Sequence, residues 1–163
     1  MSKNFLWAPW RMDYITNPNK ENDVFSKKVK SSDDRNNLVL HRSTSSFVVM
    51  NLYPYNNGHL MVVPYEKYDD MTKLNKDTLV EIMCLSQASM KILKTELNCE
   101  GFNFGLNMGK SAGAGIDDHL HFHIVPRWMG DSNFMPVTGH TKVIMENLFD
   151  TYDKLKTSFN LLK

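Results

Sequence analysis

The sequence predicts an α+β domain in which helices pack against an antiparallel sheet of five strands. Three observations lead to this fold class: short aliphatic runs separated by turn residues, two amphipathic helical patterns, and a segment in which histidine alternates with apolar residues. The length of 163 residues fits one domain, and the chain contains no internal repeat or low-complexity tract. We therefore expect a single domain over 1–163, with an N-terminal arm and loop at 1–37 and a helical extension at 138–163.

The first part of the chain divides into an apolar segment and a polar one. Residues 6–15, LWAPWRMDYI, are too apolar for an unattached tail, so we expect an arm that packs against the domain or a partner subunit. Asn, Lys, Asp and Ser dominate residues 17–37, which predicts a surface loop with room for one short helix. Val24 and Phe25 are the apolar anchor of that loop.

Three short strands are expected next. Residues 38–41, 47–52 and 60–63 are rich in aliphatic and β-branched side chains, and Asn57-Gly58 between the last two is a turn signal. This order predicts an antiparallel meander, with His59 at the start of its third strand.

A long amphipathic helix is predicted over 77–97, followed by two more strands. Its apolar positions, which recur at spacings of three, four and seven, are Leu79, Ile82, Met83, Met90, Leu93 and Leu97. We expect the methionines among them to fill the core. Gly101 would end the helix as its C-terminal cap, residues 102–106 would form the fourth strand, and the histidine-rich segment the fifth. A final helix is indicated by Leu148, Tyr152, Leu155, Phe159 and Leu162.

Composition narrows the function classes. Nineteen basic and eighteen acidic residues give a formal charge of +1, which argues against a surface that binds DNA or RNA. The first residues lack the uninterrupted apolar run of a signal peptide, and no stretch approaches the ~20 apolar residues of a membrane span, so we expect a cytoplasmic protein. Cys84 and Cys99 have no Cys-x-x-Cys spacing and are expected to be reduced core thiols.

The segment from Asn107 to Trp128 carries the chemistry. A loop with three glycines leads into His119, His121 and His123, which alternate with apolar residues and so share one strand face. Such a face has three uses: nucleophilic catalysis at phosphorus, a metal site built on His-x-His, or simply a solvated polar surface.

Spacing favours phosphoryl chemistry over the other two uses. Same-face neighbours on a strand are ~6.6 Å apart, so the outer histidines are separated by ~13 Å, whereas metal–nitrogen bonds of about 2.0–2.1 Å require close convergence. The glycine loop adds backbone N–H groups suited to phosphate oxygens, with Gly113 and Gly115 as candidate positions.

The segment from His119 to Val125 resembles the H-φ-H-φ-H-φ-φ signature of the histidine triad (HIT) superfamily of nucleotide hydrolases and transferases. The resemblance extends to LWAPWRMDYI at 6–15, NLYPYNNGHLMVVP at 51–64, the loop at 107–118 and PRWMGDSNFMPV at 126–137. The last segment is more similar to the branch of fragile-histidine-triad proteins and diadenosine tetraphosphate hydrolases and phosphorylases than to the nucleoside phosphoramidases.

The resemblance implies roles for particular residues. His121 would be the nucleophile that attacks the α-phosphorus, His119 and His123 would bind or protonate oxygens, and His59 would be the supporting histidine. Asn51 would lie near the nucleoside and Asn107 would reach the phosphate chain or leaving group. Lys110, Arg127 and Trp128 are weaker substrate-binding candidates, which equally suit solvated or packing positions.

The implied function is cleavage of dinucleoside polyphosphates through a nucleotidyl-histidine, with water competent as acceptor. The alternatives are a nucleotide-binding regulator with negligible turnover and an obligate phosphorylase. No cofactor is expected, although magnesium would travel with a polyphosphate substrate. The resemblance also implies a HIT-like homodimer with paired sheets.

Two departures from the family pattern affect these expectations. Many relatives carry a structural zinc site, whose positions here are Asp23, Ser26 and Lys67, so we expect no structural zinc. Hydrolytic relatives often carry glutamine four residues before the first triad histidine and phosphorolytic ones a hydroxyl residue, whereas this chain has Gly115.

Overall fold

The computed structural model describes residues 24–131, 138, 144 and 146–162. The predicted arm at 6–15 and the position of Asp23 lie outside these residues. The elements, in chain order, are α2 (Val24–Lys30), β1 (Val39–Arg42), β2 (Ser46–Met50), β3 (Leu60–Pro64), the 3-10 helix η2 (Met71–Lys73), α3 (Lys76–Leu97), β4 (Gly101–Gly105), the 3-10 helix η3 (Lys110–Ala112), β5 (Phe122–Arg127) and α5 (Leu148–Phe159).

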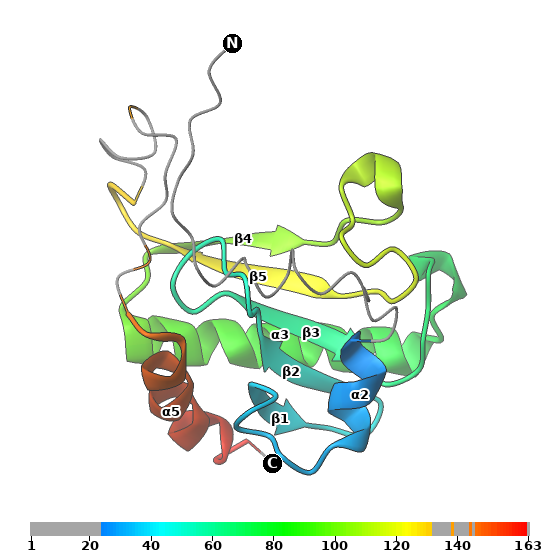
Figure 1. The fold of residues 1–163 in the computed structure, drawn as a ribbon, viewed down its shortest axis with the longest axis horizontal. Helices are drawn as coiled ribbons and strands as arrows, with labels where there is room; N and C mark the ends of the chain where they lie inside the picture. Colours follow the sequence, from blue (N-terminus) through cyan, green and yellow to red (C-terminus); the bar gives the residue numbers. More distant parts are fainter. Residues whose placement is uncertain (1–23, 132–137, 139–143, 145, 163) are drawn as a thin grey trace, which may run out of the picture.

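The five strands form one sheet in the order β1-β2-β3-β5-β4, with antiparallel pairing throughout (Figure 1). The predicted α+β class, the five-stranded antiparallel sheet and the meander of its first three strands are confirmed. Strand β5, the last of these five along the chain, lies inside the sheet between β3 and β4, so its residues have neighbours on both sides.

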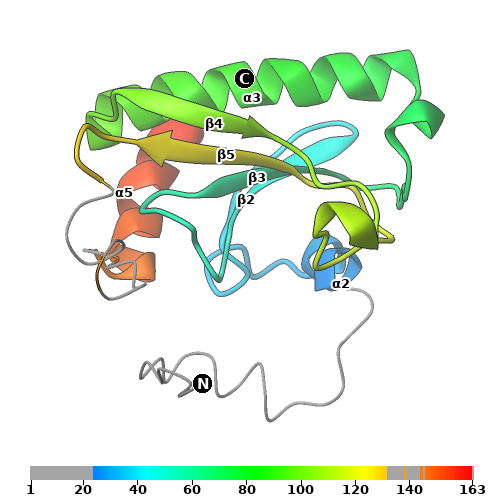
Figure 2. The same cartoon turned by 90° about the horizontal axis from the view of Figure 1, so that it is seen from above.

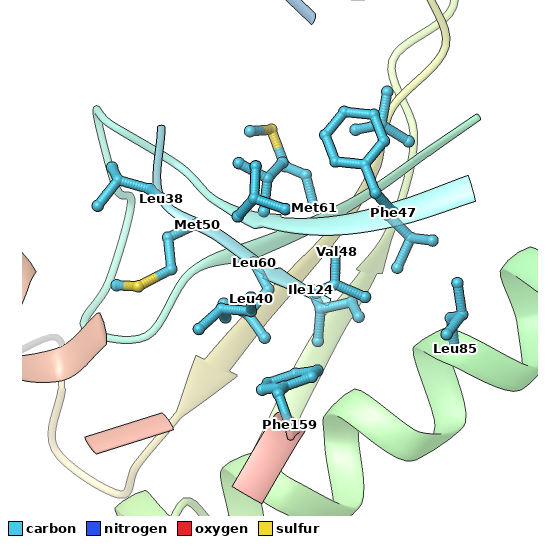
Figure 3. Packing of buried hydrophobic residues seen from close by; sticks show 14 of the residues in the cluster. Leu38, Leu40, Phe47, Val48, Met50, Leu60, Met61, Leu85, Ile124 and Phe159 are labelled. Atoms are coloured by element: carbon cyan, nitrogen blue, oxygen red, sulfur yellow. The ribbon is translucent and has the colours of Figure 1, made fainter. Parts of the chain in front are cut away.

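The two faces of the sheet are covered differently. Helix α3 runs across one face, whereas α2 lies on the opposite side of the sheet (Figure 2). Residues Leu60, Val48 and Ile124 point toward α3 and form the main core with Leu85 of α3 and Phe159 of α5 (Figure 3). Strands β2 and β3 are buried along their whole length because both of their faces are covered.

Helix α3 is capped by an asparagine at each end. The side chain of Asn75 accepts a hydrogen bond from the N–H of Thr78 at 2.8 Å, which satisfies one donor of the first turn. The helix ends at Asn98, whose φ of 50° and ψ of 37° are left-handed. The prediction that Gly101 caps this helix is therefore wrong, because Gly101 is already the first residue of β4.

The outer face of α3 corrects two further expectations. Met83 and Cys84 are exposed, although both were expected in the core, whereas Cys99 is buried as predicted. The buried residues of the helix follow Ile82, Leu85 and Leu93, and in a helix of 3.6 residues per turn Met83 and Cys84 lie outside that stripe.

The connection from β2 to β3 is held against α3 by a glycine. Gly58 has a φ of +68°, and a β-carbon at this position would lie 2.4 Å from Cδ1 of Leu97 and 3.3 Å from Cδ2 of Leu93. Only glycine combines this backbone angle with this close approach. The loop 51–59 is thereby fixed immediately before β3.

The two edges of the sheet also differ. On β1, the Tyr152 hydroxyl of α5 donates to the carbonyl oxygen of Val39 at 2.9 Å, and Lys156 Nζ donates to that of Leu40 at 2.9 Å. On β4, residues Asn103–Gly105 are exposed. One edge is thus capped by a helix of the same chain, and the other faces outward. Among the described residues, no helix is both long and apolar enough to cross a membrane.

Candidate active site

The three triad histidines lie together on the sheet face opposite α3. Strand β5 begins at Phe122, so the prediction of one strand running through His119, His121 and His123 is wrong at its start: the first two precede the strand. His119 is 2% exposed and His121 is 7% exposed, which excludes the reading of a solvated polar face. The rings of His121 and His123 meet edge to face with their centroids 4.8 Å apart.

The geometry of His121 assigns its two ring nitrogens. Nδ1 lies 2.9 Å from the carbonyl oxygen of His119, and because a carbonyl only accepts, Nδ1 carries the proton. The neutral ring therefore has its lone pair on Nε2. Burial lowers the pKa of His121 below its ordinary value and outweighs the opposing effect of this hydrogen bond. The neutral, nucleophilic form is favoured at physiological pH.

His59 is fixed in the opposite tautomer by the loop that precedes it. Its Nδ1 accepts from the backbone N–H of Tyr55 at 3.1 Å. It also lies 3.2 Å from Nδ2 of Asn51, whose Oδ1 accepts from the N–H of Tyr53 at 3.0 Å and so turns the amide nitrogen toward the ring. With two donors at Nδ1, the proton of neutral His59 is on Nε2.

The tautomer of His59 determines that of His123. His59 Nε2 lies 2.9 Å from Nδ1 of His123, so His59 donates and His123 accepts. Neutral His123 therefore carries its proton on Nε2. Burial is the first cause that lowers the pKa of His59 to about 3 and of His123 to about 4, and the charges of neighbouring histidines lower both further. Both rings are neutral at physiological pH.

Helix α2 supplies an apolar contact to the other two histidines. The buried ring of Phe25 has its centroid 5.3 Å from that of His119 and 5.4 Å from that of His121. His119 Nε2 lies 2.9 Å from the carbonyl oxygen of Pro64, which holds the ring against the end of β3. The short helix expected in the polar segment 17–37 is thus part of the site.

The glycine loop is folded more tightly than a phosphate cradle would require. The N–H groups of Ala112, Gly113 and Ala114 donate to the carbonyl oxygens of Gly109 and Lys110 at 3.0–3.3 Å. These three donors are used inside the loop, which weakens the expected role of Gly113. Gly115 is exposed, with nothing within 4 Å of a β-carbon built on it.

Two other candidates from this loop differ in position. Asn107 lies two residues after Gly105, which is the last residue of β4 and the register partner of His123. The Lys110 side chain is 85% exposed and pairs with Asp117 at 3.5 Å. Asn107 is the better placed of the two.

Arg127 and Trp128 lie at the other end of β5, ~13–17 Å along the strand from His123. Arg127 forms a two-pronged ion pair with Asp131, at 2.6 and 2.7 Å. The Trp128 indole N–H donates to the carbonyl oxygen of Leu97 at 3.2 Å. Both side chains hold the end of β5 to its neighbours, and within the chain they are not brought to the histidines.

The zinc positions implied by the family pattern do not suit a metal. Ser26 lies in α2, and Lys67 forms an ion pair with Asp118 at 2.7 Å. An ammonium group has no lone pair to donate, and the hydroxyl of serine is a poor zinc ligand beside thiolate or imidazole. In the described part of the chain, no three His, Cys, Asp or Glu side chains are grouped so as to hold a metal ion.

Tyr55 and Phe25 are contacts of the site that the sequence analysis did not assign. Phe25 stood out only as an apolar anchor, since nothing in the sequence places α2 beside the histidines. Tyr55 lies within the NLYPYNNGH motif, four residues before His59. The ring of Tyr55 lies 4.7 Å from that of His59.

The chain is similar to a described protein family and to named proteins of other organisms. Residues 33–129 match the family model described as HIT domain. Over 162 residues the chain is 39% identical to a protein of Mycobacterium tuberculosis named AP-4-A phosphorylase. The aligned region covers 94% of this chain and 83% of that protein. It is 28% identical over 93 residues to the bis(5'-adenosyl)-triphosphatase of Dictyostelium discoideum, covering 57% of this chain and 62% of that protein.

The fold is likewise shared with solved structures. The crystal structure of a zinc-bound histidine triad family protein from Mycobacterium smegmatis superimposes with a TM-score of 0.68 at 22% identity, covering 84% of this chain and 92% of that one. At this identity the likeness concerns the fold.

Proposed function

The chain belongs to the HIT-domain family, and on that premise we propose that it cleaves dinucleoside polyphosphates of the diadenosine tetraphosphate type at an α-phosphate. The observation that carries the proposal is the hydrogen bond from His121 Nδ1 to the carbonyl oxygen of His119, at 2.9 Å. It leaves the lone pair of a buried neutral imidazole on Nε2, which is the form that attacks phosphorus.

In the proposed first step, His121 Nε2 forms a bond to the α-phosphorus while the bond from phosphorus to the bridging oxygen breaks. The electron pair of that bond leaves with the nucleoside polyphosphate. The ring gains positive charge as the nitrogen–phosphorus bond forms, and the carbonyl oxygen of His119 stabilises that charge through the Nδ1 proton. A polyphosphate is a stable anion, so its departure does not depend on a strong acid.

His123 is proposed to act as a hydrogen-bond donor. Its Nδ1 accepts from His59, so its Nε2–H is the group available to an oxygen of the substrate. Negative charge spreads over the non-bridging oxygens in the transition state, where a fixed donor is most effective. We assign Asn107 to the phosphate chain or leaving group. Asn51 supports the orientation of His59 beside any contact that it makes with the nucleoside.

In the second step an acceptor oxygen attacks the phosphorus and Nε2 regains its lone pair. With water, the nucleotidyl group becomes a mononucleotide and a proton is released. With inorganic phosphate, it becomes a nucleoside diphosphate. We propose that water is competent, and the similarity to a protein named AP-4-A phosphorylase favours phosphate as a second acceptor.

Three further proposals concern metal content, assembly and compartment. We propose that the protein holds no metal of its own and that magnesium enters only with the polyphosphate. Tyr152 and Lys156 cap the β1 edge, whereas residues Asn103–Gly105 of β4 are exposed, which supports a homodimer paired through β4. The proposed compartment is the cytoplasm.

The test is to incubate purified protein with diadenosine tetraphosphate in oxygen-18 water, with and without excess inorganic phosphate, and to analyse the products by mass. We expect labelled mononucleotide without phosphate, and nucleoside diphosphate in addition when phosphate is present. Product that appears only with phosphate, and without label, would make the enzyme an obligate phosphorylase. Absence of any product under both conditions would favour a nucleotide-binding regulator.

A further inference from the structure

Tyr55 places an aromatic ring over the pair formed by His59 and His123. Its ring centroid lies 4.7 Å from that of His59 and 5.8 Å from that of His123, at interplanar angles of 37° and 31°. Its backbone N–H donates to Nδ1 of the same His59, at 3.1 Å. The side chain is nevertheless 58% exposed, so it stands between the pair and the solvent.

The hydrogen bond between His59 and His123 forms only when His59 carries a proton on Nε2 and His123 carries none on Nδ1. A single proton lies on the line between His59 Nε2 and His123 Nδ1, which are 2.9 Å apart. A second proton at Nδ1 of His123 would point directly at the N–H of His59. His59 cannot switch tautomer to relieve this, because the N–H of Tyr55 and Nδ2 of Asn51 already point at its Nδ1.

The surroundings of His123 show which sides of the pair are closed. Met61, its register partner on β3, is buried at 7% exposure. Gly105, its register partner on β4, has nothing within 4 Å of a β-carbon built on it, so this side is open to an incoming substrate. The ring of His121 meets that of His123 edge to face, with centroids 4.8 Å apart, and Tyr55 lies on the side toward the loop 51–59. Burial is the first cause of the lowered pKa of both histidines, and the ring of Tyr55 is an aromatic neighbour of both.

We propose that Tyr55 is a positioning residue of the site, whose ring keeps water from the His59–His123 pair and so maintains the neutral tautomer in which His123 presents an N–H at Nε2. Its catalytic consequence rests on the proposed function, since the pair has this role only if a phosphoryl group is transferred nearby. The consequence for the two histidines themselves is independent of that function.

The direct test is an NMR titration of histidine-labelled protein that follows His59 and His123 separately. In Tyr55→Ala the titration midpoints of both rings should rise by about one pH unit or more, because water reaches them. Tyr55→Phe keeps the ring and should leave both midpoints unchanged. Leu161→Ala is the matched control, since Leu161 is 79% exposed at the end of α5. Unchanged midpoints in Tyr55→Ala would overturn the proposal.

Tyr55→Leu guards the test against loss of folding. If circular dichroism showed that Tyr55→Ala does not fold, Tyr55→Leu should shift the midpoints upward by a smaller amount, because it keeps an apolar cover without a ring. Unchanged midpoints in that variant would then count against the proposal.

Kinetics separate positioning from substrate binding. For cleavage of diadenosine tetraphosphate, Tyr55→Ala should lower kcat and move the acidic limb of its pH profile upward, with KM little changed. A change confined to KM would make Tyr55 a substrate contact and overturn the positioning role. If the wild-type protein cleaved no dinucleoside polyphosphate, the proposed function would fail while the titration midpoints still decided the role of Tyr55.

Discussion

Nδ1 of His121 lies 2.9 Å from the carbonyl oxygen of His119, two residues earlier on the same segment. The segment thus fixes the tautomer of its own nucleophile, because the acceptor belongs to the backbone that carries the ring. Substitution of another side chain therefore does not remove the acceptor of this hydrogen bond. In the proposed mechanism His121 forms the bond to phosphorus, whereas the other histidines orient or assist.

The first prediction concerns these different roles. His121→Ala should lower kcat by about 10⁴-fold or more, since no other group can form the bond. His119→Ala and His123→Ala should cost about 10²- to 10³-fold, because these rings assist. His41→Asn, which replaces a half-buried histidine on β1, is the control and should retain activity. Near-wild-type turnover by His121→Ala would exclude the covalent mechanism.

The second prediction concerns stability against pH. The pKa is lowered to about 3 for His59 and to about 4 for His123, whereas an unfolded histidine titrates near ~6.5. Between these values the unfolded chain binds more protons than the folded one. The free energy of unfolding should therefore be fully supported above pH ~6.5 and fall as the pH drops toward 4.

Urea unfolding at a series of pH values measures this effect. His59→Gln removes one of the lowered histidine pKa values and should flatten the dependence between pH 6.5 and 4, whereas His41→Asn should leave most of it. An equally steep dependence in His59→Gln would show that other groups cause the acid sensitivity.

The third prediction concerns Gly58. Gly58→Ala should lower the free energy of unfolding by about 2 kcal/mol or more, since alanine would be strained at a φ of +68° and its β-carbon would meet Leu97. Activity should fall as well, because loop 51–59 carries the donors to His59. Gly115→Ala, with open space around it, is the matched control and should change stability little.

The fourth prediction concerns assembly. Light scattering at micromolar concentration should give twice the 18.9 kDa of one chain. Phe104→Lys, at an exposed position of β4, should produce a monomer, because it adds charge to the edge that we expect to pair. Leu161→Lys, on exposed surface elsewhere, should remain dimeric. A monomeric wild-type protein would remove the basis for paired sheets.

The sequence predicted the elements well because their periodic patterns are local. Runs of aliphatic and β-branched residues identified the first three strands, alternation identified β5 from Phe122 onward, and the three-and-four spacing identified α3 and α5. Met83 was misplaced because it is apolar but lies one residue outside the stripe defined by Ile82 and Leu85. Cap positions were less predictable, since Asn98 and Gly101 both tolerate the end of a helix.

The sequence predicted which histidines the candidate site contains but not how they are arranged. The four histidines were identified from their motifs, whereas their tautomers depend on carbonyl and N–H groups whose positions only the folded backbone defines. Arg127 was a weaker candidate from the family resemblance, and its ion pair with Asp131 could not be read from the sequence. Phe25 joins the site through a contact between distant segments, which no local pattern encodes.

The place of β5 between β3 and β4 has a consequence for how the chain folds. No ladder joins β3 to β4, so β4 can enter the sheet only once β5 has been made and has paired with both. A nascent chain that has not yet reached Arg127 has the β1–β3 meander and α3 but no means of attaching its fourth strand. His123 lies on β5 and His119 and His121 directly precede it, so the triad reaches its place when the strand that attaches β4 joins the sheet.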